Sequence, residues 1–444
     1  MSKKKLVKSA TSRMARLGSL AGRVGVSMAT NTVANYLRQV ENSDEDQSTL
    51  MMKNAMRVKD ALGELKGVPM KIGQMLSLHE NLLPDEVTRA LQSLQQKAPS
   101  APFEDIYEMI RCELGDRFEQ IEHIDRESLA AASIGQVHRA VLKDGRQIVF
   151  KVQYPGIDEV IRNDLKNLKG LLKTVFSMFT RMEIDDMWQE MKDRMLEELD
   201  YENEADNMRR MADCFAGEER VVIPEVFPEL TTRHVLAMEL VTGIGPEDAM
   251  GDHYSRALKN QWGQSLAAFI LKGLFHFQFL HADPNLSNFS FRENGCIVVY
   301  DFGCMKDVPD ALTLGYVRLV KAVLEHDYPA MPEILKSMGV HRADGSPVPW
   351  QMIKDYADEI QKIVAKNSTY TFGEDGDIYK RLQALGQKYI DEFMTMVFSK
   401  DIIFIDRTFN GHFGNLGRLK ASADWRRFVV DHIAPQFPDE AIEP

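Results

Sequence analysis

Short, mainly apolar runs of β-type residues predict a group of strands in the middle of the chain. Val137–Leu142 and Gln147–Val152 are both β-type runs, and the four residues between them have Asp144-Gly145 at their centre. An Asp-Gly pair between two such runs is a strong signal for a β-hairpin. Two further runs have strand character, Val221–Ile223 and His234–Leu240.

Helical periodicity dominates the rest of the chain. Helices are predicted over residues 50–96, over Phe103–Phe118, over the charged stretch 186–215 and over most of the chain from about residue 253. The last of these regions is interrupted at residues 289–300, where Asn294-Gly295 marks the turn of a second, short hairpin. The order is therefore a hairpin, a long helix, further strands and then a helical half, with a helical extension in front.

Charge is unevenly distributed along the 444 residues. The formal net charge is −12, which argues against general nucleic-acid binding. Residues 1–40, however, hold eight Lys and Arg and no acidic residue, and apolar residues from Met14 to Met28 recur there at helical spacing. This leader has three interpretations: a helix on an anionic membrane surface, a transit peptide, or a surface helix packed on the domain. Residues 41–49 are polar and acidic, and we interpret them as a linker.

The four cysteines form no CxxC pair and no cluster with histidine, which argues against a zinc site or a disulfide framework. A reducing compartment is therefore expected. The apolar run Leu266–Leu280 is too short to cross a membrane and is broken by Lys272 and His276, so we interpret it as a buried helix.

A catalytic signature lies in the helical half. His281-Ala282-Asp283 is followed by Asn288, five residues after the aspartate, and Asp301-Phe302-Gly303 follows the apolar run Ile297–Tyr300. A protein-kinase catalytic loop has the form H-R-D-x-x-x-x-N and is followed by D-F-G. The interval from Asp to Asn is the same here, and the short hairpin separates the two motifs as it does in kinases. The arginine, however, is replaced by Ala282, and no A-P-E follows, which argues against control by phosphorylation of an activation loop.

The strand half supplies a matching lysine. Lys151, in Ile148–Lys151, replaces the lysine of V-A-I-K that contacts nucleotide phosphates; the alternative is a surface lysine on an edge strand. Where a glycine-rich loop is expected, the chain has Ala130–Gln136, which would hold nucleotide differently because alanine restricts the backbone more than glycine. The alternative for this segment is the start of a helix. Six acids lie between Glu197 and Asp206, and one of them should pair with Lys151.

Together these motifs resemble the UbiB family, the AarF-domain or ADCK group of atypical kinase-like proteins. The resemblance runs from about residue 60 to about residue 310. Its specific marks are KIGQ at Lys71–Gln74, AAASIGQVH at Ala130–His138, ELDYENEA at Glu198–Ala205 and HADPNLSNF at His281–Phe289.

The resemblance implies roles for individual residues. Lys71, in a segment with Gln74 that would cover the peptide-substrate site, is expected to meet Glu198 and Asp200. Glu204 would be the partner of Lys151, Asp283 the catalytic aspartate, and Asn288 and Asp301 the ligands of Mg²⁺. The expected ATP-binding residues are Ala130, Ala131, Ala132, Ser133, Lys151, Glu239 and Val241.

The sequence thus predicts an α+β, two-lobed protein-kinase-like fold with an N-terminal helical extension. The expected parts are a leader and linker (1–49), the extension (50–120), an N-lobe (121–243) and a mostly helical C-lobe (244–444). The expected function is that of an ATP- and Mg²⁺-dependent ATPase or atypical kinase supporting ubiquinone or related isoprenoid-lipid metabolism. The alternatives are a conventional protein kinase and a nucleotide-gated scaffold without turnover.

The same reasoning gives expected partners and a location. Besides ATP, the expected partners are an anionic membrane surface, isoprenoid lipids or quinone-biosynthesis proteins. Nucleic acid is not an expected partner. The expected location is the cytoplasm, peripheral to the inner membrane, or the matrix side of the mitochondrion.

Overall fold

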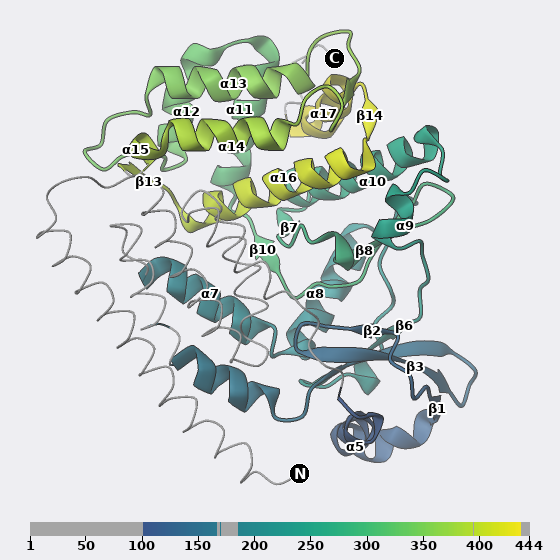
Figure 1. Ribbon diagram of the computed structural model, residues 1–444. Helices are drawn as coiled ribbons and strands as arrows, with labels where there is room; N and C mark the ends of the chain where they lie inside the picture. Colours follow the sequence, from purple (N-terminus) through teal and green to yellow (C-terminus); the bar gives the residue numbers. More distant parts are fainter. Residues whose placement is uncertain (1–100, 167–168, 170–184, 394, 437–444) are drawn as a thin grey trace, which may run out of the picture. The chain divides into compact units, whose positions relative to one another are not determined.

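A computed structural model describes residues 101–166, 169, 185–393 and 395–436 (Figure 1). These residues form two compact units. The first holds the described residues up to Tyr201 together with Glu229–Ala237, and the second holds Glu202–Pro228 and the chain from Met238 onward. The predicted N-lobe, 121–243, is thus divided between the units. The predicted leader, the extension before residue 101, Lys71 and Gln74 lie outside the described residues.

The first unit is built on one sheet with the order β1-β3-β4-β6, in which β2 also pairs with β3. The pairings of β3 with β1, β2 and β4 are antiparallel. The predicted hairpin is confirmed, because β3 pairs with β4 and Gly145 supplies a positive φ of 89° at the turn. The strands are β1 (Ile121–Ile124), β2 (Ala130–Ala131), β3 (Gly135–Leu142), β4 (Gln147–Gln153) and β6 (Val235–Glu239), whose last two residues belong to the second unit.

The core of the first unit lies between this sheet and an amphipathic helix. The predicted helix at Phe103–Phe118 appears as α5 (Phe103–Leu114) followed by a 3₁₀ turn, η1 (Gly115–Gln120). Ile106 and Ile110 of α5 are fully buried, as are Ile148 and Phe150 of β4, against which the helix packs. Burial of these side chains stabilises the sheet at the place where it carries Lys151.

The predicted helical stretch 186–215 is interrupted. α7 (Asp185–Glu197) ends in a tight turn, where the N–H of Asp200 donates to the carbonyl of Glu197 (3.0 Å), and α8 (Tyr201–Cys214) then begins. The N–H of Tyr201 donates to the carbonyl of Arg233 (3.0 Å), a bond outside the helix that fixes the break. Residues 198–200, which carry the predicted acids Glu198 and Asp200, therefore lie between two helices.

The second unit is mainly helical. Its central helix is α10 (Arg256–Phe275), and the apolar run that we interpreted as a buried helix forms the end of α10 and the strand β7 (Phe279–His281). The predicted second hairpin is confirmed as β8 (Phe289–Phe291) and β9 (Ile297–Val299), and β5 (Val221–Val222) runs parallel to β9. Trp262 of α10 is fully buried, and its indole N–H donates to the carbonyl of Arg292 (2.6 Å).

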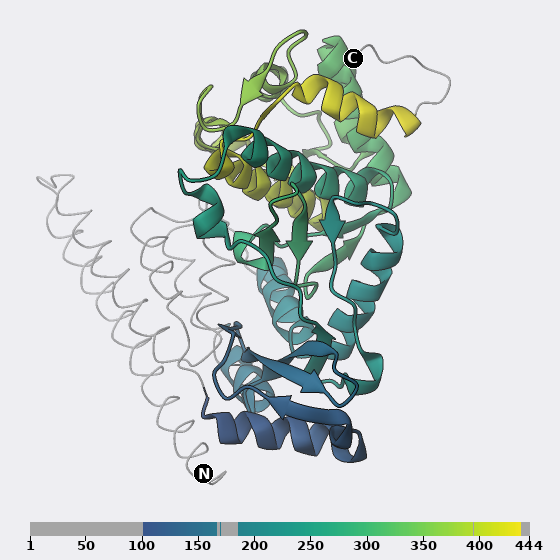
Figure 2. The same cartoon turned by 90° about the vertical axis from the view of Figure 1, so that its right-hand side faces the viewer.

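The C-terminal helices complete this unit. α16 (Lys400–Leu419) lies alongside α10, as Figures 1 and 2 both show. No helix in the described part of the chain is both long and apolar enough to cross a membrane. The remaining elements are α9 (Pro246–Met250), η3 (Leu286–Asn288), β10 (Met305–Asp307), α11 (Asp310–Glu325), η4 (Tyr328–Ala330), α12 (Met331–Ser337), β11 (His341–Arg342), α13 (Trp350–Ile363), β12 (Tyr370–Thr371), α14 (Ile378–Lys388), α15 (Ile390–Phe393), β13 (Met396–Val397), β14 (Ser422–Ala423), α17 (Trp425–Ile433) and η5 (Ala434–Gln436). A further 3₁₀ turn, η2 (Pro228–Leu230), begins in the second unit and ends in the first.

Candidate active site

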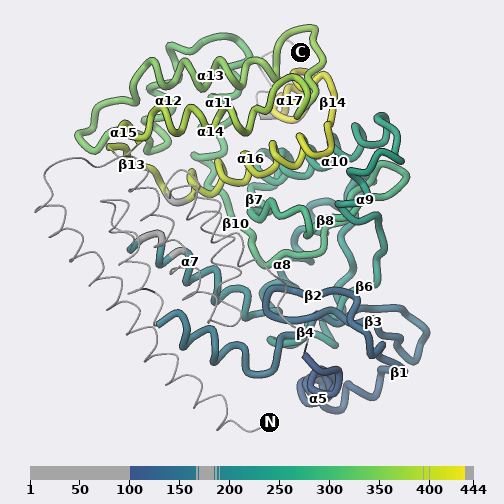
Figure 3. Tube along the Cα trace, in the orientation of Figure 1, coloured from purple at the N-terminus to yellow at the C-terminus, as the bar shows by residue number. Residues whose placement is uncertain are grey.

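The loop between β7 and β8 holds the predicted catalytic aspartate, and its course can be followed in Figure 3. Asp283 is half-buried, and both of its carboxylate oxygens accept hydrogen bonds from the same loop. One bond comes from the N–H of Asn285 (3.2 Å) and the other from the side-chain amide of Asn288 (3.1 Å). These bonds favour the charged carboxylate and fix its orientation.

The structure brings Asn288 and Asp301 together. The N–H of Tyr300 donates to the carbonyl of Asn288 (3.0 Å), which continues the β8–β9 pairing and sets Asp301 one residue further along. The Nε2–H of buried His281 donates to the carbonyl of Asp301 (2.7 Å), and one carboxylate oxygen of Asp301 accepts from the N–H of Gly303 (3.1 Å). Both predicted motifs are thus joined within one unit.

The donor atoms at this place suit a hard cation. The amide nitrogen of Asn288 faces Asp283, so its amide oxygen is the atom that a cation would meet. A second oxygen donor is the carboxylate of Asp301. No group of three or more His, Cys, Asp or Glu that could hold a metal occurs among the described residues. Two protein oxygens fit Mg²⁺, which is usually bound through one or two such groups together with water and substrate phosphates.

Helix α8 holds the backbone of Phe302. A carboxylate oxygen of Glu204, which is 3% exposed, accepts from the N–H of Phe302 (3.4 Å), and the side-chain amide of Asn207 donates to the carbonyl of Phe302 (3.1 Å). Sequence reasoning missed Asn207. Its spacing of three residues from Glu204, which places both on one face of a helix, was the available signal.

Lys151 lies inside the sheet of the first unit. β4 has β3 on one side and β6 on the other, and Lys151 is only 8% exposed, so the alternative of a surface lysine on an edge strand is wrong. Its ammonium nitrogen lies 5.1 Å from the ring centroid of Tyr201, within reach of a cation–π interaction. Glu204 belongs to the other unit, so its pairing with Lys151 stays a prediction.

The alanine-rich segment forms a tight hairpin and not the start of a helix. β2 pairs with β3, and the N–H of Ala132 donates to the carbonyl of Gly135 (2.9 Å). A Cβ at Gly135 would lie 2.1 Å from the carbonyl oxygen of Val152, so only glycine fits there. The hydroxyl of Ser133 donates to the carboxylate of Glu198 (3.0 Å), which ties the hairpin to the residues between α7 and α8.

Glu239 is the last residue of β6, and Val241 follows the strand; both belong to the second unit. The N–H of Glu239 donates to the carbonyl of Glu225 (2.8 Å), and the carbonyl of Val241 accepts from the hydroxyl of Tyr300 (3.1 Å). Tyr300 directly precedes Asp301, so this hydrogen bond links the segment of Val241 to the predicted metal ligand.

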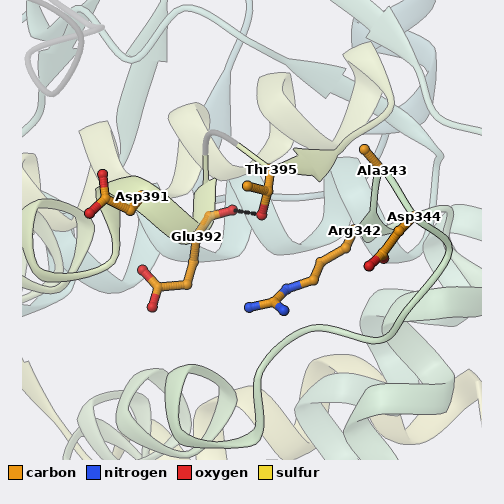
Figure 4. Close-up of a pocket in the computed structure, with 6 residues that line it drawn as sticks. All are labelled: Arg342, Ala343, Asp344, Asp391, Glu392 and Thr395. Atoms are coloured by element: carbon orange, nitrogen blue, oxygen red, sulfur yellow. Dashed lines mark hydrogen bonds between the residues drawn. The ribbon is translucent and has the colours of Figure 1, made fainter.

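A cavity of about 460 Å³ lies elsewhere in the second unit (Figure 4). Arg342 and Asp344 lie on one side of it and Asp391 and Glu392 on the other, with Ala343 and Thr395 completing the lining. None of the predicted site residues contributes to it. With one arginine and three carboxylates, its lining does not suit a nucleotide phosphate.

His412 of α16 packs against the end of the catalytic loop. It is 4% exposed and packs edge to face against Phe289, with ring centroids 5.9 Å apart. Burial, together with the neighbouring His281, lowers the pKa of His412 to about 3, although Asp283 opposes this shift. His412 is therefore neutral near pH 7 in the folded protein.

A pH dependence of stability follows from this depressed pKa. Below the ordinary histidine pKa of 6.5, the unfolded chain binds a proton at position 412 that the folded protein excludes. The contribution of neutral His412 to the free energy of unfolding is therefore fully present above about pH 6.5. It is lost as pH falls, and the loss is about 2 kcal/mol at pH 5. We expect His412→Gln to remove this loss in urea denaturation at pH 7 and pH 5. The exposed His253→Gln is the control and should retain it; equal pH dependence in wild type and His412→Gln would contradict the prediction.

Comparison with known proteins agrees with this geometry. The model of the ABC1 atypical kinase-like domain matches residues 93–335. The atypical kinase COQ8B, mitochondrial, of Danio rerio is 33% identical over 70% of this chain and 50% of its own length. The atypical kinase coq-8, mitochondrial, of Caenorhabditis elegans is 29% identical over 92% of this chain and 55% of its own. The chain thus spans about half the length of these relatives.

A solved structure supports the fold. The complex of Rv3197 with erythromycin from Mycobacterium tuberculosis matches with a TM-score of 0.63 and 24% identity, over 88% of this chain and 98% of the other. At that identity the similarity shows the fold alone, and the predicted kinase-like α+β fold is confirmed. Since the family model covers more than half of the chain, including the loop of Asp283 and the motif of Asp301, the chain belongs to the ABC1 atypical kinase-like, or UbiB, family.

Proposed function

We propose that the chain is a Mg²⁺-dependent ATPase or atypical kinase that supports ubiquinone or related isoprenoid-lipid metabolism. One observation carries the catalytic part of the proposal. The loop of Asp283 and the motif of Asp301 are joined through the bond from His281 to the carbonyl of Asp301 and the backbone bond from Tyr300 to Asn288. Phosphoryl transfer depends mainly on positioning and on neutralising charge, and this arrangement serves both purposes.

Each residue then has a role. Lys151 would place its ammonium group on nucleotide phosphates, and its apolar strand strengthens the interaction by excluding water. Asn288 and Asp301 would hold Mg²⁺, which neutralises phosphate charge when bound. Asp283, oriented by Asn285 and Asn288, would accept a proton from the attacking water or hydroxyl group. We also propose that the regions 121–243 and 244–444 act as the two lobes of one kinase-like domain.

A conventional protein kinase is less well supported. Ala282 stands where such kinases have an arginine that reads a phosphorylated activation loop, and it is fully buried. Its N–H donates to the carbonyl of Cys304 (2.9 Å), which continues the pairing of β7 with β10. Ala282 is therefore part of the strand packing, and its side chain provides no positive charge that could bind a phosphate.

The metabolic role rests on the relatives, several of which carry the name COQ8. The test is a quinone and metabolite profile of a strain lacking the gene, complemented with the wild type or with Asp301→Asn. Restoration by the wild type alone is expected. If the wild type fails to restore the quinone pool, the proposed metabolic role is wrong. The proposed ATPase activity is tested separately, by an assay of ATP turnover.

We further propose a peripheral location on an anionic membrane, either in the cytoplasm at the inner membrane or on the matrix side of the mitochondrion; the second is in keeping with relatives named mitochondrial. Residues 1–40 carry eight cationic side chains and no acids, each worth up to about 1 kcal/mol near an anionic surface. We expect the full chain to float with phosphatidylserine vesicles at low salt, and a chain lacking residues 1–40 to bind much less. Equal, salt-insensitive binding by both would contradict this prediction.

A further inference from the structure

Two residues of helix α16 contact Pro284 of the catalytic loop. The side-chain amide of Asn415, which is 6% exposed, donates to the carbonyl of Pro284 (2.7 Å). One turn earlier, Gly411 lies so close to Pro284 that a Cβ there would be 2.4 Å from the proline Cγ and 2.5 Å from its Cβ. Pro284 directly follows Asp283, so α16 touches the loop beside the predicted catalytic carboxylate.

His412 adds a third contact on the same face of the helix. Its ring packs against Phe289, the residue after Asn288, and its Nδ1 lies 3.4 Å from the amide nitrogen of Asn415. The amide of Asn415 thus has one hydrogen for the carbonyl of Pro284 and one directed toward His412. Helix α16 therefore contacts the loop near its start, at Pro284, and at its end, at Phe289.

The helix itself is well anchored. The next turn of α16 packs against α10, where Leu416 contacts the position of Gly263, and a Cβ at Gly263 would lie 2.3 Å from the Cβ of Ala421. Pro284 is buried, and its ring fixes the backbone φ of the loop, so a displacement of Pro284 would carry Asp283 with it. Because close-packed interiors transmit strain, a clash at Pro284 would be passed on to the loop.

We propose that Gly411, His412 and Asn415 of α16 are positioning residues that set the place of the catalytic loop through Pro284 and Phe289. The catalytic consequence rests on the proposed function, whereas the structural consequence for the loop does not. Since a misplacement of 1 Å can cost about a hundredfold in rate, the contact from α16 should matter for turnover although none of the three residues need touch the substrate.

The chain offers a matched pair of substitutions on one helix. Gly411→Ala and Gly414→Ala both add one methyl group to α16 and both gain helix propensity. A Cβ at Gly414, however, has nothing within 4 Å, whereas the one at Gly411 meets Pro284. We expect Gly411→Ala to lower the kcat for ATP about tenfold to a hundredfold with little change in KM, and Gly414→Ala to leave both unchanged.

A second measurement needs no activity. Hydrogen exchange of the full chain, read by mass spectrometry on peptides covering residues 279–291, should be faster in Gly411→Ala than in Gly414→Ala or wild type. Asn415→Leu keeps the number and branching of the side-chain heavy atoms but removes the donor to Pro284, and should lower kcat about tenfold and speed the same exchange. It also serves if Gly411→Ala does not fold.

The outcomes separate the two proposals. A wild type without ATP turnover overturns the proposed function, and the exchange measurement still decides the role of α16. Exchange of the loop at the wild-type rate in folded Gly411→Ala or Asn415→Leu overturns the positioning role. An active wild type whose kcat is matched by both of these variants overturns it as well.

Discussion

Asp301→Asn is expected to abolish the thermal stabilisation of the protein by Mg²⁺ and ATP and to lower ATP turnover at least about a hundredfold, since a bound metal stabilises developing charge by several kcal/mol. The substitution keeps the size of the side chain and removes its negative charge. The backbone of position 301 stays held by His281, so the loss reports on the carboxylate and not on the fold. The measurements are a thermal-shift titration with MgATP and a phosphate-release assay.

A control for this prediction lies six residues along the chain. Asp307→Asn makes the same chemical change at an exposed side chain, 73% accessible, that pairs with Arg210. Exposed ion pairs contribute little to stability, so this variant should behave as wild type in both assays. If Asp301→Asn still shows the wild-type thermal shift with MgATP, then Asp301 is not part of the site.

Short-range patterns carried most of what the sequence could predict. The two hairpins were predictable because a turn pair, Asp144-Gly145 or Asn294-Gly295, lies between β-type runs only a few residues apart. The loop of Asp283 and the motif of Asp301 were found by spacing alone, since chemistry fixes the interval between residues of one loop. In such segments the local signal and the final structure agree.

Contacts between residues far apart in the sequence could not be predicted from it. The break between α7 and α8 depends on the bond from Tyr201 to the carbonyl of Arg233, which only the folded sheet supplies. The bond from Asn415 to Pro284 joins residues 131 positions apart, and the bond from Ser133 to Glu198 joins residues 65 apart. Periodicity identifies the face of a helix but not the partner it meets, so the role of α16 could not be predicted.

Glu204 shows how the two kinds of information combine. The family resemblance implies that it pairs with a lysine, and the structure adds that it accepts a hydrogen bond from the N–H of Phe302. Asn207, one turn further along α8, donates to the carbonyl of the same residue. Phe302 follows Asp301, so both backbone bonds fix the direction from which the carboxylate of Asp301 approaches a metal ion.

Asn207→Asp is expected to raise the Mg²⁺ concentration for half-maximal ATP turnover by about 10- to 100-fold, the usual cost of losing a group that orients a metal ligand. The new carboxylate would face the carbonyl oxygen of Phe302 and repel it, because an ionised aspartate cannot donate a hydrogen bond. Phe302 would move, and Asp301 with it. The change is nearly isosteric, so packing of α8 should persist. The measurement is turnover as a function of Mg²⁺ at saturating ATP.

The matched control is Asn203→Asp, the same substitution on the same helix at an exposed side chain one turn earlier. It adds an equal charge to α8, so a general electrostatic effect on Mg²⁺ would appear in both variants, and an effect through Phe302 only at position 207. Added negative charge by itself should attract a cation and lower the Mg²⁺ requirement. The two explanations therefore predict opposite signs for Asn207→Asp. An unchanged or lowered Mg²⁺ requirement in Asn207→Asp would show that the bond to Phe302 does not orient Asp301.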